Sequence, residues 1–191
     1  MDNHEPDNDR LQVAHSQLKS DPQQAVKELE MLAEMGSARA PLYLGWAYRK
    51  GDGAPLDPAQ AEYWLKVSLA RGERLASYYL GHFYADLGRL AEANSAFEQG
   101  SKLGCAPSTY CLAMNLLEGV PEPENVLRAK CLLETASSQG HAFALRALAS
   151  LHLSGQLGVL KIAYGFWLWA RAVARGACIA VRSADDDRLR A

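Results

Sequence analysis

Apolar and small residues recur along the chain at helical spacing rather than in the alternation of a half-buried strand. One pattern has a small residue and, four positions later, a Leu followed by Gly or Ala, as in APLYLG at residues 40–45. The leucines are Leu44, Leu80, Leu112 and Leu148, spaced 36, 32 and 36 residues apart. Positions i, i+4 and i+8 share one helical face, so the pattern predicts four copies of a helix that we name helix A.

A second pattern follows each copy and ends in glycine. The glycines are Gly36, Gly72, Gly104, Gly140 and Gly176, spaced 36, 32, 36 and 36 residues apart. Eleven positions earlier stands a small residue, in order Ala25, Ala61, Ala93, Ala129 and Gly165. Offsets of 0, 3, 7 and 8 from that residue trace another amphipathic face, helix B. The closing glycine suits the left-handed residue that ends many helices, and Asp21-Pro22 and Asp57-Pro58 predict capped starts.

The chain therefore reads as consecutive A–B helix pairs, each joined by a hairpin turn and followed by a glycine turn. The small residues let neighbouring helices approach closely, and a large side chain there should clash with the next layer. One pair cannot bury its apolar face alone, so the pairs must stack. We predict an all-α fold: a right-handed α-solenoid of stacked antiparallel helix pairs without strands.

Residues 40–64 carry A-x-x-x-L-G-x-x-Y-x-x-G-x-G-x-x-x-D-x-x-x-A-x-x-W, which resembles the Sel-one-like (Sel1-like) repeat, a relative of the tetratricopeptide repeat. Residues 76–104 lack the Trp and four hairpin residues, and look more like a tetratricopeptide repeat. Residues 108–140 and 144–176 keep the spacing but read Leu-Ala. The resemblance implies a tetratricopeptide-like superhelix and an interaction module. Bacterial members commonly act as scaffolds or adaptors, some near surface-polysaccharide or secretion machinery.

The repeat boundaries predict how the chain is organised. Residues 1–9 are an acidic tail that we expect to be disordered, and residues 10–191 form a single helical repeat domain. Its parts are a cap unit at 10–36, repeats at 40–72, 76–104, 108–140 and 144–176, and a C-terminal capping helix at 177–191.

Composition narrows the possible partners and the compartment. The 191 residues are 49% hydrophobic and 22% charged, with a net charge of −2, so neither nucleic acid nor an anionic membrane is an expected partner. The most apolar run, residues 158–170, is too short to span a bilayer. The first residues carry no apolar signal segment, and we expect a cytoplasmic protein. The cysteines, Cys105, Cys111, Cys131 and Cys178, form no C-x-x-C pair and are expected to be buried thiols.

The loop KGDGAPLD at residues 50–57 has two aspartates and two glycines and could hold a cation or phosphate. Its first glycine, Gly51, recurs in the third and fourth repeats, whereas Asp57 aligns with Asn125 and Lys161. A loop that keeps glycine but not charge is a hairpin turn, and we expect no calcium binding.

No catalytic or metal-binding motif occurs in the sequence. His152 takes the place of a packed helix A residue and His141 follows a turn glycine, so structural roles are favoured for both. We expect no enzyme activity, no catalytic residues, no metal ligands and no cofactors. A carbohydrate-processing enzyme is the weakest alternative, because the only acidic residues predicted in the groove are Asp86 and Glu118, on successive repeats.

In tetratricopeptide-like superhelices, helix A lines the concave groove. Counting from each helix A leucine, the side chains at −2, +2, +5 and +6 should face that groove. The main candidates for the partner-binding groove are Leu42, Trp46, Arg49, Lys50, Tyr78, His82, Tyr110, Met114 and Arg146. The same count also places Ser150 and Leu153 there. Aromatic and Met side chains are common interface anchors, although aromatic residues at helical spacing also fit a core.

The main hypothesis is a non-enzymatic scaffold or adaptor that binds a protein or peptide in this groove. The arginines and Lys50 suit a peptide with acidic residues or a free C-terminus. Two alternatives remain open: self-assembly through the solenoid ends as a weak homodimer, and an accessory subunit of a bacterial surface-polysaccharide or secretion system. The repeat itself does not specify a function.

Overall fold

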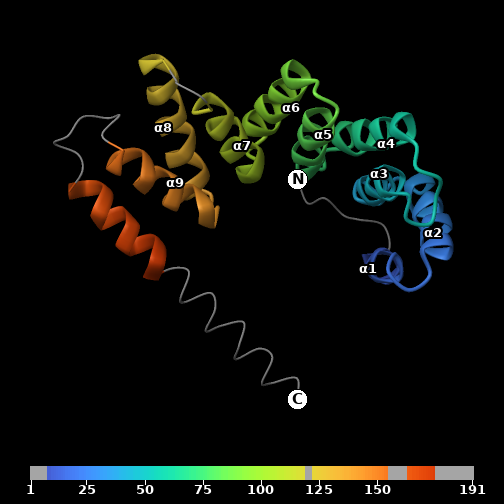
Figure 1. The fold of residues 1–191 in the computed structure, drawn as a ribbon. Coiled ribbons are helices and arrows are strands. Elements are labelled where there is room, and N and C mark those ends of the chain that lie inside the picture. Colours follow the sequence, from blue (N-terminus) through green and yellow to red (C-terminus); the bar gives the residue numbers. More distant parts are fainter. Residues whose placement is uncertain (1–7, 119–121, 155–162, 175–191) are drawn as a thin grey trace. The chain divides into compact units, whose positions relative to one another are not determined.

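The structure is a computed structural model that describes residues 8–118, 122–154 and 163–174 (Figure 1). The regular structure of this part of the chain is entirely helical, which confirms the all-α class. The helices are α1 (Asn8–Gln17), α2 (Pro22–Glu34), α3 (Ala40–Lys50), α4 (Pro58–Ala70), α5 (Leu75–Asp86), α6 (Leu90–Lys102), α7 (Ala106–Leu116), α8 (Pro123–Ser138), α9 (Ala142–Leu153) and a further helix over residues 163–174.

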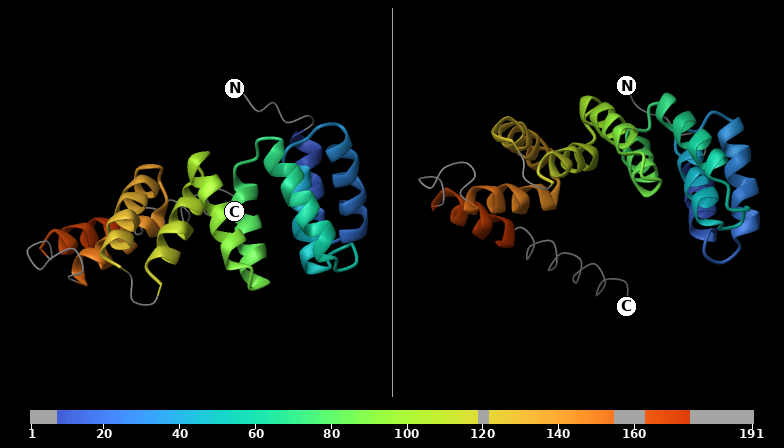
Figure 2. Two further views of the ribbon diagram at one scale, coloured as in Figure 1. Left: turned by 90° about the horizontal axis from the view of Figure 1, so that it is seen from above. Right: turned by 45° about the horizontal axis from the view of Figure 1, so that its top comes forward.

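The chain divides into two compact units, residues 1–103 and 104–191. In unit 1 each helix from α1 to α6 packs on the next, and in unit 2 α7 packs on α8 and α8 on α9 (Figure 2). This consecutive pairing is the packing of an all-α repeat solenoid, with α3–α4, α5–α6 and α7–α8 as A–B pairs. The hand of the superhelix and the single domain over 10–191 stay predictions.

The structure tests the prediction for the N-terminal end of the chain but not the prediction for the C-terminal end. Helix α1 begins at Asn8, inside the segment that was expected to be a disordered tail of residues 1–9. The predicted capping helix at 177–191 lies outside the described residues, as does Cys178.

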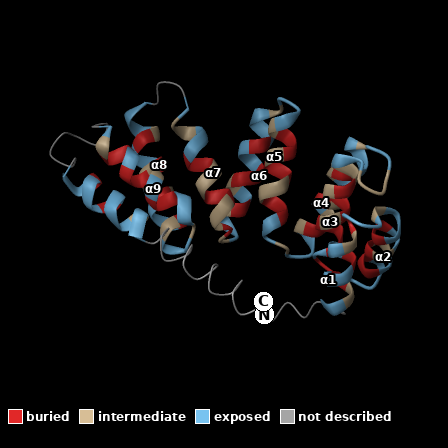
Figure 3. Cartoon of the chain, turned by 60° about the horizontal axis from the view of Figure 1, so that its bottom comes forward, coloured by how far each residue is buried: buried red, intermediate tan, exposed pale blue. Residues whose placement is uncertain are grey.

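The core lies where the repeat pattern predicts it. The helix A leucines are each exposed by 6% or less, and Ala25, Ala61, Ala93 and Ala129 of helix B are fully buried. Figure 3 shows the buried positions along the faces where consecutive helices of a unit meet, and exposed positions on the outer faces. Because a fully buried Leu contributes about 1.5–3 kcal/mol, the four helix A leucines are a main source of cohesion within the helix pairs.

The glycine of the Leu-Gly pair permits this close packing. A Cβ atom on Gly45 would lie 2.7 Å from Leu65 Cγ, and one on Gly81 would lie 2.6 Å from Phe97 Cδ1 and Cζ. Both distances are shorter than any normal carbon contact, so helix B crosses helix A at a point where only glycine fits. In unit 2 Ala113 and Ala149 take this place and are fully buried.

The loop at residues 50–57 is a turn. Gly51 ends α3 in the left-handed conformation, with φ of 78°. The Asp57 side chain accepts hydrogen bonds from the backbone N–H groups of Ala59 and Gln60 at 2.9 and 3.1 Å, and so caps α4. A Cβ atom on Gly53 would overlap the carbonyl of Pro22, so the loop packs directly on the start of α2.

A hydrogen-bonded junction holds the turn between α2 and α3 against α4. Arg71 Nη1 donates to the carbonyl oxygens of Ala33 and Ser37, at 2.7 and 2.8 Å. Ser68 Oγ donates to the carbonyl oxygen of Ala38 at 2.7 Å. Helix ends leave carbonyl groups without intrahelical partners. The Ala33 carbonyl at the end of α2 accepts from the Gly36 N–H at 3.0 Å, and this junction adds a second donor from the next helix pair.

Candidate functional site

The first groove candidates, on α3, are largely part of the core of unit 1. Leu42 is only 7% exposed, which corrects the expectation that its side chain faces an open groove. Trp46 is half-buried and packs against the core cluster of α1–α3. The apolar surface that α3 offers to a partner is therefore smaller than the sequence suggested.

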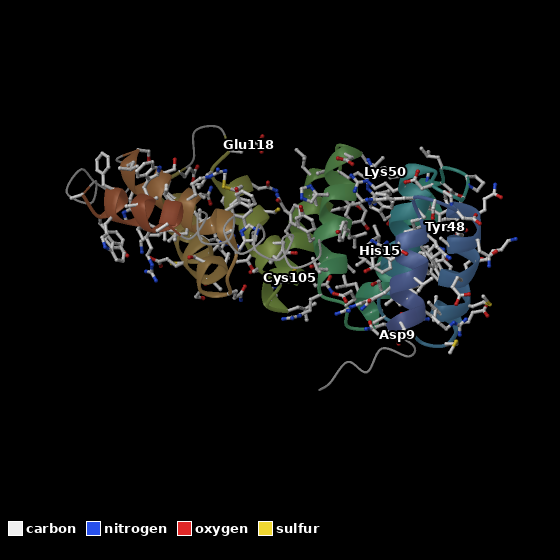
Figure 4. All side chains as sticks on the ribbon, turned by 90° about the horizontal axis from the view of Figure 1, so that it is seen from below. Asp9, His15, Tyr48, Lys50, Cys105 and Glu118 are labelled. Carbon is white, nitrogen blue, oxygen red and sulfur yellow. The ribbon has the colours of Figure 1, made fainter. Side chains whose placement is uncertain are left out.

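The two cations at the end of α3 differ in their environment. Arg49 forms an ion pair with Asp86 of α5, and its side chain is only 23% exposed. Its charge is thus already compensated within unit 1, contrary to the expectation of a cation available to a partner. Lys50, the last residue of α3, is exposed (Figure 4).

On α5 the two candidates form an aromatic cluster. The rings of Tyr78 and His82 meet edge to face with centroids 4.5 Å apart, and His82 meets Phe97 of α6 in the same way at 5.4 Å. Burial, and secondly the charge of Arg49, lower the pKa of His82, whereas Asp86 opposes this shift. The His82 ring thus packs between α5 and α6.

Unit 2 contains a pocket that gathers the remaining candidates. It has a volume of about 450 Å³ and lies between α7, α9 and the helix over 163–174. Its lining consists of Tyr110, Met114, Phe143, Arg146, Ala147, Ser150, Leu153 and Trp169. Five of these residues are ones that the leucine count placed in the groove, and the structure brings them together; their role in binding stays a prediction.

The lining combines exposed apolar surface with one charge. Met114, Phe143 and Trp169 are 39%, 55% and 52% exposed, although large apolar side chains usually find cover. Tyr110 stacks on His141 with ring centroids 4.6 Å apart, which fixes the orientation of its ring. The guanidinium of Arg146 lies 5.2 Å from the centroid of the Phe143 ring, a cation–π contact.

Three residues of the pocket lining were not predicted from the sequence. Phe143 and Ala147 lie on α9 beside Arg146, outside the four offsets counted from the helix A leucine. Trp169 belongs to the helix after α9, a helix B position that the repeat rule assigns to the outer face. The signal that could have found it is the density of aromatic residues in YGFWLW at 164–169.

That last helix packs as its pattern predicts. Leu168 is buried in the core of unit 2, and Ala172 packs against it. A Cβ atom on Gly165 would lie 2.9 Å from Cβ of His152. His152 itself is 1% exposed and meets the Tyr164 ring edge to face at 5.1 Å, as expected for a core histidine.

A second pocket, of about 360 Å³, lies on the helix B side of unit 1, beside a cluster of paired charges. Glu62 accepts hydrogen bonds from Lys66 Nζ at 2.6 Å, Tyr84 Oη at 2.9 Å and Arg89 Nη1 at 3.0 Å. These bonds, that of Lys66 first, lower the pKa of Glu62 to about 2 against the opposing effect of burial. The cluster joins α4, α5 and the start of α6. Because its groups are bonded to one another, we assign it to the packing of these helices and not to binding.

The described part of the chain holds no group of three or more His, Cys, Asp or Glu side chains placed to bind a metal ion. Cys105, Cys111 and Cys131 are free thiols, and burial, with a smaller effect of Cys105, raises the pKa of Cys111 to about 11. Cys131 is exposed, which corrects the expectation of a buried thiol at that position. None of the described helices is long and apolar enough to cross a membrane.

Comparison with known proteins gives structural matches only. No family model and no curated protein matches the chain. The Sel1 repeat protein from Oxalobacter formigenes matches with a TM-score of 0.69 and 25% identity, over 82% of this chain and 65% of that one. A protective antigen of uropathogenic Escherichia coli with an SLR fold matches with a TM-score of 0.63 and 22% identity, over 79% and 34% of the respective chains. This chain thus spans less than two thirds of either protein.

These matches and the consecutive helix pairs define a helical repeat solenoid of the tetratricopeptide-like class. The fold is the one seen in Sel1 repeat structures, as the motif at residues 40–64 indicated. Proteins with this fold commonly act as scaffolds for protein interactions.

Proposed function

We propose that this protein is a non-enzymatic scaffold or adaptor that binds a peptide or protein segment on its A helices. The observation that carries the proposal is the pocket of unit 2, which exposed Met, Phe and Trp side chains line together with Arg146. Such a mixture of apolar anchors and a few polar groups is typical of binding pockets and of interface hot spots. The cytoplasmic setting stays a prediction.

The test is affinity capture from the native host with matched surface variants. Met114→Glu combined with Phe143→Glu places two charges in the pocket, and both positions are exposed enough to keep the fold. Leu127→Glu is the control, because Leu127 is 59% exposed on α8 and does not line the pocket. We expect the wild type and the control to retain partners that the double variant loses, with the same helical circular dichroism in all three. Equal capture by all three proteins contradicts the proposal.

Self-assembly is a second candidate, favoured by the helix over 163–174. Tyr164, Phe166, Trp167 and Val173 are 49–60% exposed on it, and exposed apolar patches often mark association sites. Sedimentation equilibrium of the wild type and of Phe166→Glu tests this idea. A wild type that is monomeric up to high micromolar concentration excludes it.

A further inference from the structure

The unit 2 pocket has three zones along α9. It extends from Phe143 to Leu153, which is ten residues, or about 15 Å at the rise of an α-helix. Both ends are apolar: Phe143 lies at one, and Leu153 lies at the other. Arg146 and Ser150 stand between them, one helical turn apart and therefore on the same face.

Among the described residues that line the pocket, Arg146 alone is charged. Its guanidinium stacks on Phe143, and within the described part of the chain no carboxylate pairs with it. By contrast, Arg10, Arg39, Arg49 and Arg89 each form an ion pair with an acidic side chain. Arg146 is exposed and lies beside apolar side chains of the pocket, so the carboxylate of a partner can form a charge-assisted hydrogen bond with it.

Resting on the function proposed above, we infer that this pocket binds an extended partner segment in which one acidic side chain lies between two apolar ones. Alternate side chains of an extended strand point to the same side and are spaced by about 6.6–6.8 Å. Side chains i, i+2 and i+4 therefore span about 13–14 Å, close to the length of the pocket along α9. The outer two fill the apolar ends, and the central carboxylate accepts hydrogen bonds from Arg146 and the Ser150 hydroxyl.

A free C-terminal carboxylate fits the three zones less well. The chain ends at that carboxylate, so a terminal group bound to Arg146 leaves one apolar end of the pocket without a side chain. An internal acidic residue continues in both directions and covers Phe143 as well as Leu153. The order of the zones along α9 therefore favours an internal Asp or Glu.

The first experiment is a selection from random peptides displayed as fusions with both peptide ends blocked. We expect the wild type to enrich the pattern apolar-x-acidic-x-apolar. The enrichment of the acidic position should disappear with Arg146→Gln and persist with Arg171→Gln. Arg171 is a matched control because it also stacks on an aromatic ring, that of Trp167 at 5.4 Å, but does not line the pocket.

The second experiment measures affinities of the selected sequences as acetylated and amidated peptides. Replacing the central Glu by Gln should weaken binding to the wild type by about tenfold, the usual effect of a charge-assisted hydrogen bond. The same replacement should change binding to Arg146→Gln by less than about twofold. The indole N–H resonance of Trp169, assigned with Trp169→Phe, should shift on binding.

The outcomes separate this inference from the general function. Peptides that bind with no preference for an acidic residue, or equally well to Arg146→Gln, overturn the inference but leave the scaffold function standing. A requirement for a free C-terminal carboxylate in place of the internal acid also overturns it. If no peptide is enriched at all, the inference and the peptide-binding function both fail.

Discussion

Gly81 offers the sharpest test of the packing between helices A and B. It lies in the middle of α5, where Phe97 of α6 crosses, and a Cβ atom at this place would lie 2.6 Å from two atoms of the Phe97 ring. Phe97 is 2% exposed and its ring also meets the ring of His82, so it has little room to move. Gly81→Ala therefore forces the two helices apart or distorts the aromatic cluster.

Two opposing effects decide how much Gly81→Ala changes the free energy of unfolding. Alanine is better than glycine inside a helix by about 1 kcal/mol. Forcing an extra methyl group into a well-packed core costs typically about 1–3 kcal/mol. Since the contact is with a rigid, buried ring, we expect the upper end, and a net loss of about 2 kcal/mol. For a chain of this size that loss lowers Tm by about 4–8 °C.

The assay is thermal unfolding followed by circular dichroism in two backgrounds. In the wild type, Gly81→Ala should lower Tm. In Phe97→Leu, which removes the ring, the same substitution should have no effect or raise Tm, because only the gain in helix propensity remains. The reasoning is refuted if Gly81→Ala raises Tm in the wild-type background.

Three further predictions concern polar contacts within unit 1. Arg71→Met should destabilise the protein by about 1–3 kcal/mol, since it removes the charged donor that two carbonyl groups share; an unchanged midpoint of urea unfolding contradicts this. Glu62→Gln should flatten the acid dependence of stability. The pKa of Glu62 is lowered from 4.5 to about 2, so its contribution is complete above about pH 4.5 and is lost as the pH falls toward 2. Stability curves that stay parallel for wild type and variant over this range contradict the assignment, with Glu98→Gln as the surface control. Asp57→Ala should cost about 1 kcal/mol through the lost cap of α4, and calcium titration of the wild type should show no saturable binding.

The helices and their contact faces could be predicted because the repeat gives the same evidence several times. Leu44, Leu80, Leu112 and Leu148 were placed in the core by spacing alone, and all four are buried. Asp21 and Asp57 were recognised as N-caps, and both accept backbone hydrogen bonds at helix starts. Local rules suffice here because helix faces and caps depend on residues close in sequence.

Whether a groove residue is exposed, or already paired with another side chain, could not be predicted in the same way. Leu42 and Arg49 stand at the right offsets, but one is buried and the other is paired with Asp86 on the next helix A. That pairing joins residues 37 positions apart. A periodicity rule applied to one helix therefore cannot predict it. Trp169 was missed for a similar reason, because its place in the pocket depends on how a helix B lies against α9.

The junction at Arg71 has a consequence for how this repeat array can be altered. The residue just before the closing glycine is Arg here and at Arg175, whereas Met35, Leu103 and Gln139 occupy the other equivalent places. Ser68 is replaced by Leu32, Gly100, Ala136 and Ala172, so the pair of Ser and Arg occurs in this repeat alone. The repeats are therefore not interchangeable modules: moving residues 40–72 elsewhere in the array, or deleting them, would separate the donors Ser68 and Arg71 from their carbonyl groups, and no other repeat carries both donors. Chimeras of this protein should be cut inside the hairpins that join α1 to α2 and α5 to α6, so that Ala33, Ser37 and Ala38 stay in one piece with Ser68 and Arg71.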